Sequence, residues 1–89
     1  MRYTTSHPRD MNDELTTRLR NLVGEVTRRD ASKLGVDDDL VAALLLDSLE
    51  ALRVMALVEK RFGVRFEDAE IHDVRTLRQL AATVERRRP

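Results

Sequence analysis

Apolar residues recur along much of the chain with the period of an α-helix, and this feature restricts the chain to helical folds. After about residue 12 they fall at positions i, i+4, i+7, i+8 and i+11, namely Leu15, Leu19, Leu22, Val23 and Val26. This spacing places them on one face of an amphipathic helix, whose start Asn12 or Asp13 can cap. No segment shows the alternation of apolar and polar residues that a half-buried strand needs. The pattern predicts an all-α fold.

Three more helical segments are expected in the rest of the chain. One runs from about Ser48 to Phe62, and Gly63 can act as its C-terminal cap. A helical wheel places these residues on its inner side: Ala51, Leu52, Met55, Val58 and Phe62. Residues 67–74 have room for one or two helical turns. Thr76 can cap a last helix, whose apolar positions are Leu77, Leu80, Ala81 and Val84. The chain is thus expected to form a four-helix bundle whose third helix is short.

A long acidic connection, about residues 30–46, joins the first two predicted helices. Gly35 and the run Asp37-Asp38-Asp39 favour turns, and residues 42–46 have room for a short helical turn. Five apolar residues can attach the connection to the core: Leu34, Val36, Leu40, Leu44 and Leu46. Connections of this length are uncommon in small domains and are often functional. The end of this connection, where it meets the second helix, is therefore a candidate functional position.

The composition excludes several kinds of site and partner. The chain has no cysteine, and its two histidines, His7 and His72, are too few and too far apart to suggest a metal site. The formal net charge is zero, whereas a nucleic-acid-binding domain usually has a basic excess. The longest apolar run, residues 40–46, is far shorter than the roughly 18 residues of a membrane span. We expect a cytoplasmic monomer with no metal, nucleic-acid or membrane partner.

Asp47 and Ser48 stand at the head of the second predicted helix. Both residue types are favoured N-caps, and Asp47 with Glu50 three residues later is similar to a capping box. On local chemistry alone, a structural capping role is favoured over a special function. A hydrolase would need a base oriented by a third group, and only His7 and His72 are available. No catalytic role is predicted.

The order of these features resembles the acyl carrier protein family over about residues 12–86. The acidic connection leads into Asp47-Ser48-Leu49-Glu50, similar to the family's Asp-Ser-Leu followed by an acidic residue. Phe62-Gly63 at the helix end and Thr76-Leu77 at the last helix are also similar to the family. One residue departs from the pattern, because the family usually has glycine at the position of Leu45. Since glycine adopts positive φ easily and leucine does not, this departure bears on the shape of the loop.

The resemblance implies a freestanding carrier protein that is not an enzyme. It implies that Ser48 receives a 4'-phosphopantetheine arm from coenzyme A through a separate, magnesium-using phosphopantetheinyl transferase. The carrier would hold acyl or polyketide-type intermediates as thioesters and present them to acyl-loading and acyl-processing enzymes. A helix N-terminus also suits a phosphodiester. The expected organisation is a flexible leader (1–11), a carrier domain (12–86) and a tail (87–89).

The family's second helix typically presents acids to basic partner surfaces. Here Arg53 stands where the resemblance predicts an acid, and Leu57 falls on the charged side of the helix. A solvated helix face of mixed charge would give the same pattern. We nevertheless hypothesise a surface for partner recognition and a specialised biosynthetic pathway, the contact residues being Asp47, Leu49, Glu50, Arg53 and Leu57.

Two other functions remain open from the residues alone. The first stays within the carrier class and is an aminoacyl or peptidyl carrier protein, because Asp-Ser-Leu also occurs in such carriers. The second is a helical adaptor or helix-turn-helix module in which Ser48 is only a cap, although zero net charge disfavours DNA. The aliphatic core could enclose an acyl chain or be completely filled.

Overall fold

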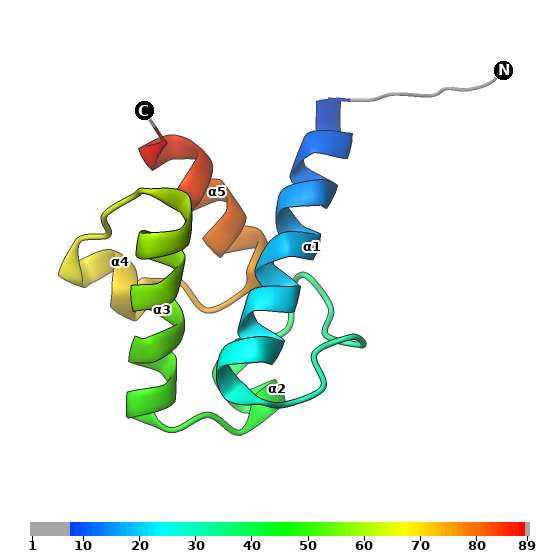
Figure 1. Cartoon of the computed structure of the whole chain (residues 1–89), viewed down its shortest axis with the longest axis vertical. Coiled ribbons are helices and arrows are strands. Elements are labelled where there is room, and N and C mark those ends of the chain that lie inside the picture. The colour runs from blue at the N-terminus through cyan, green and yellow to red at the C-terminus, as the bar shows by residue number, and fades with distance from the viewer. Residues whose placement is uncertain (1–7, 89) are drawn as a thin grey trace, which may run out of the picture.

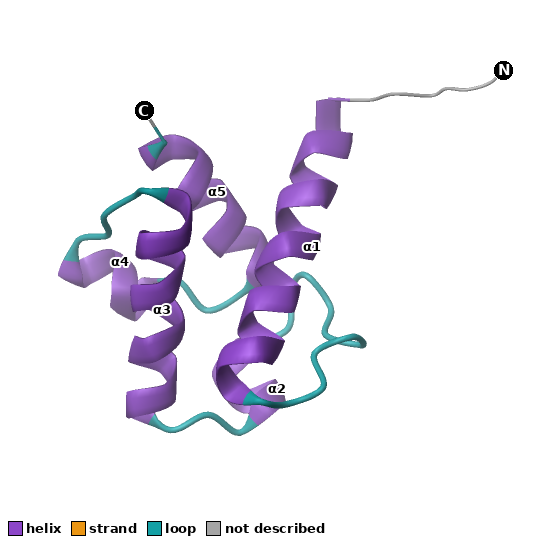
Figure 2. Ribbon diagram, viewed as in Figure 1, coloured by secondary structure: helices purple, strands orange, loops and turns teal. Residues whose placement is uncertain are grey.

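The fold is helical throughout the described part of the chain. A computed structural model describes the backbone of residues 8–88 and the side chains of residues 14–88. Figure 2 shows helices and loops but no strand in that range. The helices are α1 (Pro8–Thr27), α2 (Leu40–Leu44), α3 (Ser48–Phe62), α4 (Asp68–Asp73) and α5 (Leu77–Arg87). The predicted all-α bundle with a short helix before the last one is confirmed, and α2 is an additional short helix within the long connection.

The core lies where the three long helices meet. α1 packs against both α3 and α5 (Figure 1). Each of these helices contributes fully buried aliphatic side chains, which are Leu19, Val23, Val58, Leu77, Leu80 and Val84. The predicted stripe of α1 is buried apart from Val26, which is half-buried. The core is therefore aliphatic, with Phe66 as its one buried aromatic residue among those described.

The ends of α1 and α5 differ slightly from the predicted boundaries. α1 begins at Pro8, so residues 8–11 are helical, although the sequence pattern assigned them to the leader, and Asn12 and Asp13 lie inside the helix. Proline suits the first turn of a helix, because the N–H that it lacks would have no intrahelical partner there. α5 extends to Arg87, one residue further than predicted. The remainder of the predicted leader, residues 1–7, lies outside the described residues.

The buried side of α3 is rotated relative to the predicted one. Val54, Met55 and Val58 are buried. Leu52, which the helical wheel placed inside, is 51% exposed. The helix is apolar nearly all round, so the wheel could not show which apolar flank the neighbouring helices cover. The structure corrects that assignment.

The long connection is fixed to the start of α5 by its acidic residues and by two backbone hydrogen bonds. Asp37 pairs with Arg78 through two hydrogen bonds of 2.8 and 3.1 Å, and Asp39 pairs with Arg75 at 2.9 Å. The N–H of Leu40 donates to the carbonyl of Arg75, and the N–H of Arg78 donates to the carbonyl of Val36. The Asp39 carboxylate also caps α2, because it accepts hydrogen bonds from the N–H groups of Val41 and Ala42. The connection is thus a fastened segment that ends at α3.

Low pH should weaken the ion pairs that Asp37 and Asp39 make with the start of α5. The hydrogen bond from Arg78 lowers the pKa of Asp37, and the N–H of Ala42 chiefly lowers that of Asp39. A carboxyl whose pKa is lowered by folding stabilises the fold above its ordinary value of about 3.9, and this stabilisation is lost as pH falls through the lowered value. The urea midpoint of unfolding should therefore decrease as pH falls from about 5 to about 2, and it should decrease less in Asp37→Asn/Asp39→Asn.

The matched control for this prediction is Asp73→Asn. Asp73 is exposed and makes no ion pair within residues 14–88, so its substitution should leave the pH dependence unchanged. Equal pH dependence of the wild type and the double variant would show that these two carboxylates do not fasten the connection.

Candidate functional site

Ser48 is the first residue of α3 and its side chain is exposed. The predicted capping box is present. The Asp47 carboxylate accepts from the N–H of Glu50 at 2.8 Å, and the Glu50 carboxylate accepts from the N–H of Asp47 at 3.3 Å. Because Asp47 provides the cap, the Ser48 hydroxyl is not needed for it and makes no hydrogen bond within the described part of the chain. The structural alternative, in which Ser48 serves as the cap, is therefore not the arrangement found.

The first turn of α3 gives this hydroxyl a favourable setting for an anionic group. The first N–H groups of a helix lack intrahelical partners, and the helix dipole is positive at this end. The loop before Ser48 is anchored by Leu44 and Leu46, which are both buried. The hydroxyl is thus exposed on a well-supported turn, and a phosphodiester would fit there.

Leu45, where the family usually has glycine, adopts the left-handed backbone conformation. Its φ is 56° and its ψ is 45°, and it ends α2 as the C-terminal cap. Leucine is therefore held here in a conformation that glycine adopts easily, at a cost of about 1–2 kcal/mol for a non-glycine residue. Its side chain is 80% exposed, so packing does not recover that cost.

Replacing Leu45 with glycine should therefore stabilise the protein. Glycine removes the steric cost of the left-handed conformation but gains more freedom in the unfolded chain. The net effect should be an increase of about 0.5–1 kcal/mol in the free energy of unfolding. Urea denaturation measures this change, and Leu49→Gly should instead destabilise the protein, because Leu49 lies in the first turn of α3. A loss of stability in Leu45→Gly would contradict the strain at this residue.

An apolar cleft of about 520 Å³ opens beside Ser48. Ser48 and Asp47 lie on its border with His72 and Arg75. The aliphatic part of its lining comes from α2, α3, α4 and their connections, and consists of Leu40, Val41, Leu46, Ala51, Leu52, Val54, Met55, Ile71 and Val74. An open and mostly apolar cleft thus lies beside Ser48 at the surface of the bundle.

The wall of this cleft formed by α4 is held differently from the others. α4 has no buried residue, although Ile71 packs against the core. Glu70 pairs with Arg87 at 2.9 Å and with Arg86 at 3.4 Å, which ties α4 to the end of α5. The N–H of Glu67 and then Arg87 hold the pKa of Glu70 below its ordinary value. Charge pairs with α5 and the packing of Ile71 thus hold this wall together.

His72 lines the same cleft as Ser48, which the sequence did not indicate. Its side chain is exposed and makes no hydrogen bond with the described residues. A nucleophile–base pair of the serine hydrolase type needs a third group that orients the base. The structure supplies an exposed hydroxyl beside an apolar cleft, and His72 has no orienting group among the side chains described.

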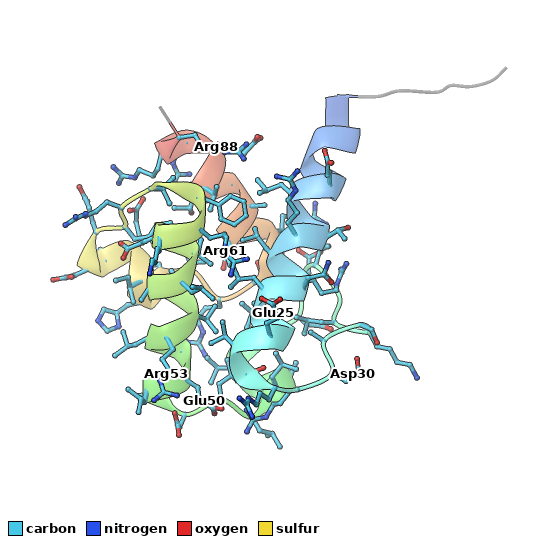
Figure 3. The ribbon with its side chains drawn as sticks, viewed as in Figure 1. Glu25, Asp30, Glu50, Arg53, Arg61 and Arg88 are labelled. Atoms are coloured by element: carbon cyan, nitrogen blue, oxygen red, sulfur yellow. The ribbon has the colours of Figure 1, made fainter. Side chains whose placement is uncertain are left out.

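The five residues predicted to contact partners fall into two groups. Asp47, Leu49 and Arg53 are exposed around the start of α3. Glu50 is half-buried and pairs with Arg29 at 2.6 Å, and Leu57 is half-buried against the core. Figure 3 shows Glu50 and Arg53 at the same end of α3, the end at which the helix begins.

Two exposed residues near Ser48 were not predicted as part of this surface. They are Leu45 and Leu52, and with Leu49 they are the large apolar side chains that are mostly exposed in residues 14–88. The glycine-to-leucine departure was the available signal for Leu45. Leu52 had no such signal, because its exposure depends on how α3 is rotated in the bundle.

Neither a metal site nor a membrane span is found in the described residues. No group of three or more His, Cys, Asp or Glu side chains there could hold a metal ion. None of the helices is long and apolar enough to cross a bilayer.

Comparison with known proteins identifies similar sequences and a similar fold. A family model described as a phosphopantetheine attachment site matches residues 17–84. The polyketide-8 synthase acyl carrier protein 2 of Streptomyces avermitilis is 37% identical over 59 residues, which are 66% of this chain and 68% of that protein. An acyl carrier protein of Rhodococcus erythropolis is 28% identical over 83% of this chain and 81% of that protein.

Among solved structures, the HMG-ACPI domain from the CurA module of Lyngbya majuscula has a similar fold. Its TM-score is 0.75, and the alignment covers 97% of this chain and 86% of that domain. The sequence identity is 17%, so this similarity concerns the fold alone.

Proposed function

The chain belongs to the acyl carrier protein family, since the phosphopantetheine attachment model covers residues 17–84, and from this premise we propose that Ser48 bears the 4'-phosphopantetheine arm. Carriers of this family interact with a phosphopantetheinyl transferase and with biosynthetic enzymes. When attached, the arm supplies a thiol that holds cargo as a thioester. Family membership also decides against the helical adaptor and the helix-turn-helix module.

One observation carries the assignment of Ser48. Its hydroxyl is exposed at the N-terminus of α3 and is free of hydrogen bonds to described residues, because Asp47 caps the helix. Attachment forms a bond from the Ser48 oxygen to the pantetheine-bearing phosphorus of coenzyme A. The bond from that phosphorus to the bridging oxygen of the pyrophosphate breaks, adenosine 3',5'-bisphosphate leaves, and the proton of the serine hydroxyl passes to a base or to water in the transferase site. The phosphodiester would then lie at the positive end of the α3 dipole, near N–H groups without intrahelical partners.

The test is to weigh the intact protein after incubation with coenzyme A, magnesium and a broad-specificity phosphopantetheinyl transferase. A mass gain of one phosphopantetheinyl group supports the proposal. An unmodified wild-type chain, in an assay where a known carrier is fully converted, would overturn it.

We further propose that the cargo is an acyl or polyketide-type intermediate of a specialised biosynthetic pathway. The cleft beside Ser48 is lined chiefly by aliphatic side chains, which suits a hydrocarbon chain better than a charged aminoacyl group. The similar Streptomyces protein is named as a polyketide synthase carrier, which agrees with this cargo class. A cytoplasmic location, the freestanding state and a monomer remain predictions.

Filling the cleft should expose the cargo to water. Ala51 lines the cleft, and Ala51→Phe would occupy part of it. If the chain of an octanoyl thioester lies in the cleft, its hydrolysis should be severalfold faster in Ala51→Phe than in the wild type, because a covered thioester is shielded from water. Release of octanoate, followed over time, measures the effect.

The matched control is Ala56→Phe, an exposed position on the same helix outside the cleft, which should leave the hydrolysis rate unchanged. Equal rates in all three proteins would show that the chain lies outside the cleft.

We propose that Asp47, Leu49 and Arg53 contact partner enzymes directly, because they are exposed around Ser48. Glu50 and Leu57 are assigned a positioning role in the same surface. Glu50 joins the start of α3 to Arg29, and Leu57 packs inward on the core. Transfer of cargo onto Arg53→Glu tests this, measured with the native partner and with a general fatty-acid-synthesis enzyme. If neither enzyme's rate differs between the variant and the wild type, Arg53 takes no part in recognition.

A further inference from the structure

The exposed large apolar side chains of residues 14–88 lie close to one residue in the sequence. Leu45, Leu49 and Leu52 are 80%, 58% and 51% exposed, and each lies within four positions of Ser48 in the sequence. Single exposed apolar residues are common on protein surfaces, but a group of them indicates an interaction site. We call these three residues together with Arg53 the leucine surface.

The fold does not require a leucine side chain at position 45. The left-handed backbone there ends α2, a role that glycine would fill with less strain, and the side chain is mostly in water. The leucine side chain therefore adds nothing to the fold that glycine would not provide. Residues held in strained backbone conformations often lie at functional sites. A contact with another molecule gives this leucine a role that the isolated protein does not.

The charges of α3 determine what kind of molecule fits this surface. Glu50 is engaged by Arg29 at 2.6 Å, and Glu59 accepts a hydrogen bond from the N–H of Phe66 at 2.7 Å. The cations Arg53 and Lys60 are exposed and make no ion pair among the described residues. Glu50 is thus paired with a cation and Glu59 is hydrogen-bonded to the backbone, whereas Arg53 and Lys60 have no ion-pair partner in residues 14–88.

Asp47 is the one exposed acid at the start of α3, and its carboxylate is occupied in the capping box. This hydrogen bond leaves the charge of Asp47 in place, and Arg53 is the exposed cation that lies next to Leu52 in the sequence. Figure 3 shows Arg53 on α3 near Glu50, whose own charge is paired. The start of α3 thus differs from a helix that presents only acids to a basic partner.

We propose that the leucine surface docks an enzyme whose own docking face is an apolar depression bordered by carboxylates, one of which pairs with Arg53. This inference rests on the proposed function, because the partner must reach an arm on Ser48. Apolar contact with the three leucines would supply affinity, and the carboxylates would select this carrier over carriers with acidic helices.

Two enzymes that differ in the charge of their docking face test the role of Arg53. One is a malonyl transferase of general fatty acid synthesis whose carrier-binding face carries lysine and arginine, and the other is its variant with those cations changed to glutamate. The variant should load the phosphopantetheinylated wild-type chain about threefold faster than the parent enzyme does, and Arg53→Glu should reverse this preference. The same preference in wild type and Arg53→Glu would overturn the proposal.

The probe for the apolar part is Leu45. Leu45→Asn introduces a residue that tolerates positive φ but removes the apolar side chain. The KM of the glutamate variant of the malonyl transferase for this carrier should therefore rise severalfold. Leu45→Met keeps an apolar side chain and should retain the wild-type KM. Unchanged KM in Leu45→Asn would remove Leu45 from the docking surface.

The failure of this proposal can be distinguished from that of the proposed function. If the phosphopantetheinyl transferase attaches no arm at Ser48, the carrier assignment fails before docking is measured. If the arm is attached fully in every variant and the malonyl loading rates do not depend on the charges of enzyme and carrier, only the docking proposal fails.

Discussion

Replacing Ser48 with alanine should abolish attachment of the phosphopantetheine arm completely. The family attachment model covers this position, and in the structure Ser48 offers an exposed hydroxyl at the start of α3. Intact mass measurement after treatment with coenzyme A, magnesium and transferase should show one added group in the wild type and none in Ser48→Ala.

The variant should remain folded, which makes the result interpretable. The Ser48 hydroxyl makes no hydrogen bond with described residues, and Asp47 keeps the cap, so the free energy of unfolding should change by less than about 0.5 kcal/mol. Ser32→Ala is the matched control, since Ser32 is an exposed serine of the connection and its loss should leave attachment intact. A mass gain that persists in Ser48→Ala would place the arm elsewhere.

Replacing Leu19 with alanine should cause the largest loss of stability among single leucine truncations on α1 and α3. Leu19 is fully buried on α1, the helix that packs against both α3 and α5. Removing a buried leucine side chain leaves a cavity and typically costs about 2–5 kcal/mol. A domain of this size has a total stability on the order of 5–10 kcal/mol. Urea or thermal unfolding should therefore show a large shift toward the unfolded state.

Leu52→Ala provides the same chemical change at an exposed position. Because Leu52 is more than half exposed, its truncation should cost no more than about 1 kcal/mol. If Leu52→Ala were as destabilising as Leu19→Ala, the rotation of α3 in the bundle would be wrong.

Features set by neighbours in the sequence could be predicted. The capping box of Asp47 and Glu50 is present, Gly63 ends α3 with a φ of 67°, and Thr76 caps α5 by accepting from the N–H of Gln79. Each depends on residues within one helical turn, so local chemistry is sufficient to indicate it. The aliphatic stripe of α1 was predictable for the same reason.

Features set by residues distant in the sequence could not be predicted. The pair of Arg29 and Glu50 joins positions 21 residues apart, and no local pattern indicates it. The exposure of Leu52 in place of Val54 depends on which side of α3 its neighbours cover. In the candidate site, the place of Ser48 at the head of α3 was predictable from the sequence, whereas the cleft and the position of His72 in its lining required the assembled bundle.

The way in which α4 is attached should make the size of the cleft respond to ionic strength. Glu70, whose side chain is 16% exposed, ties α4 to α5 through Arg86 and Arg87, and α4 has no fully buried residue. Dissolved salt partly screens these pairs but hardly weakens the aliphatic packing of α1, α3 and α5. Outward displacement of α4 would widen the cleft while the rest of the bundle stays closed. The carrier would thus admit bulkier cargo by a local rearrangement, without partial unfolding.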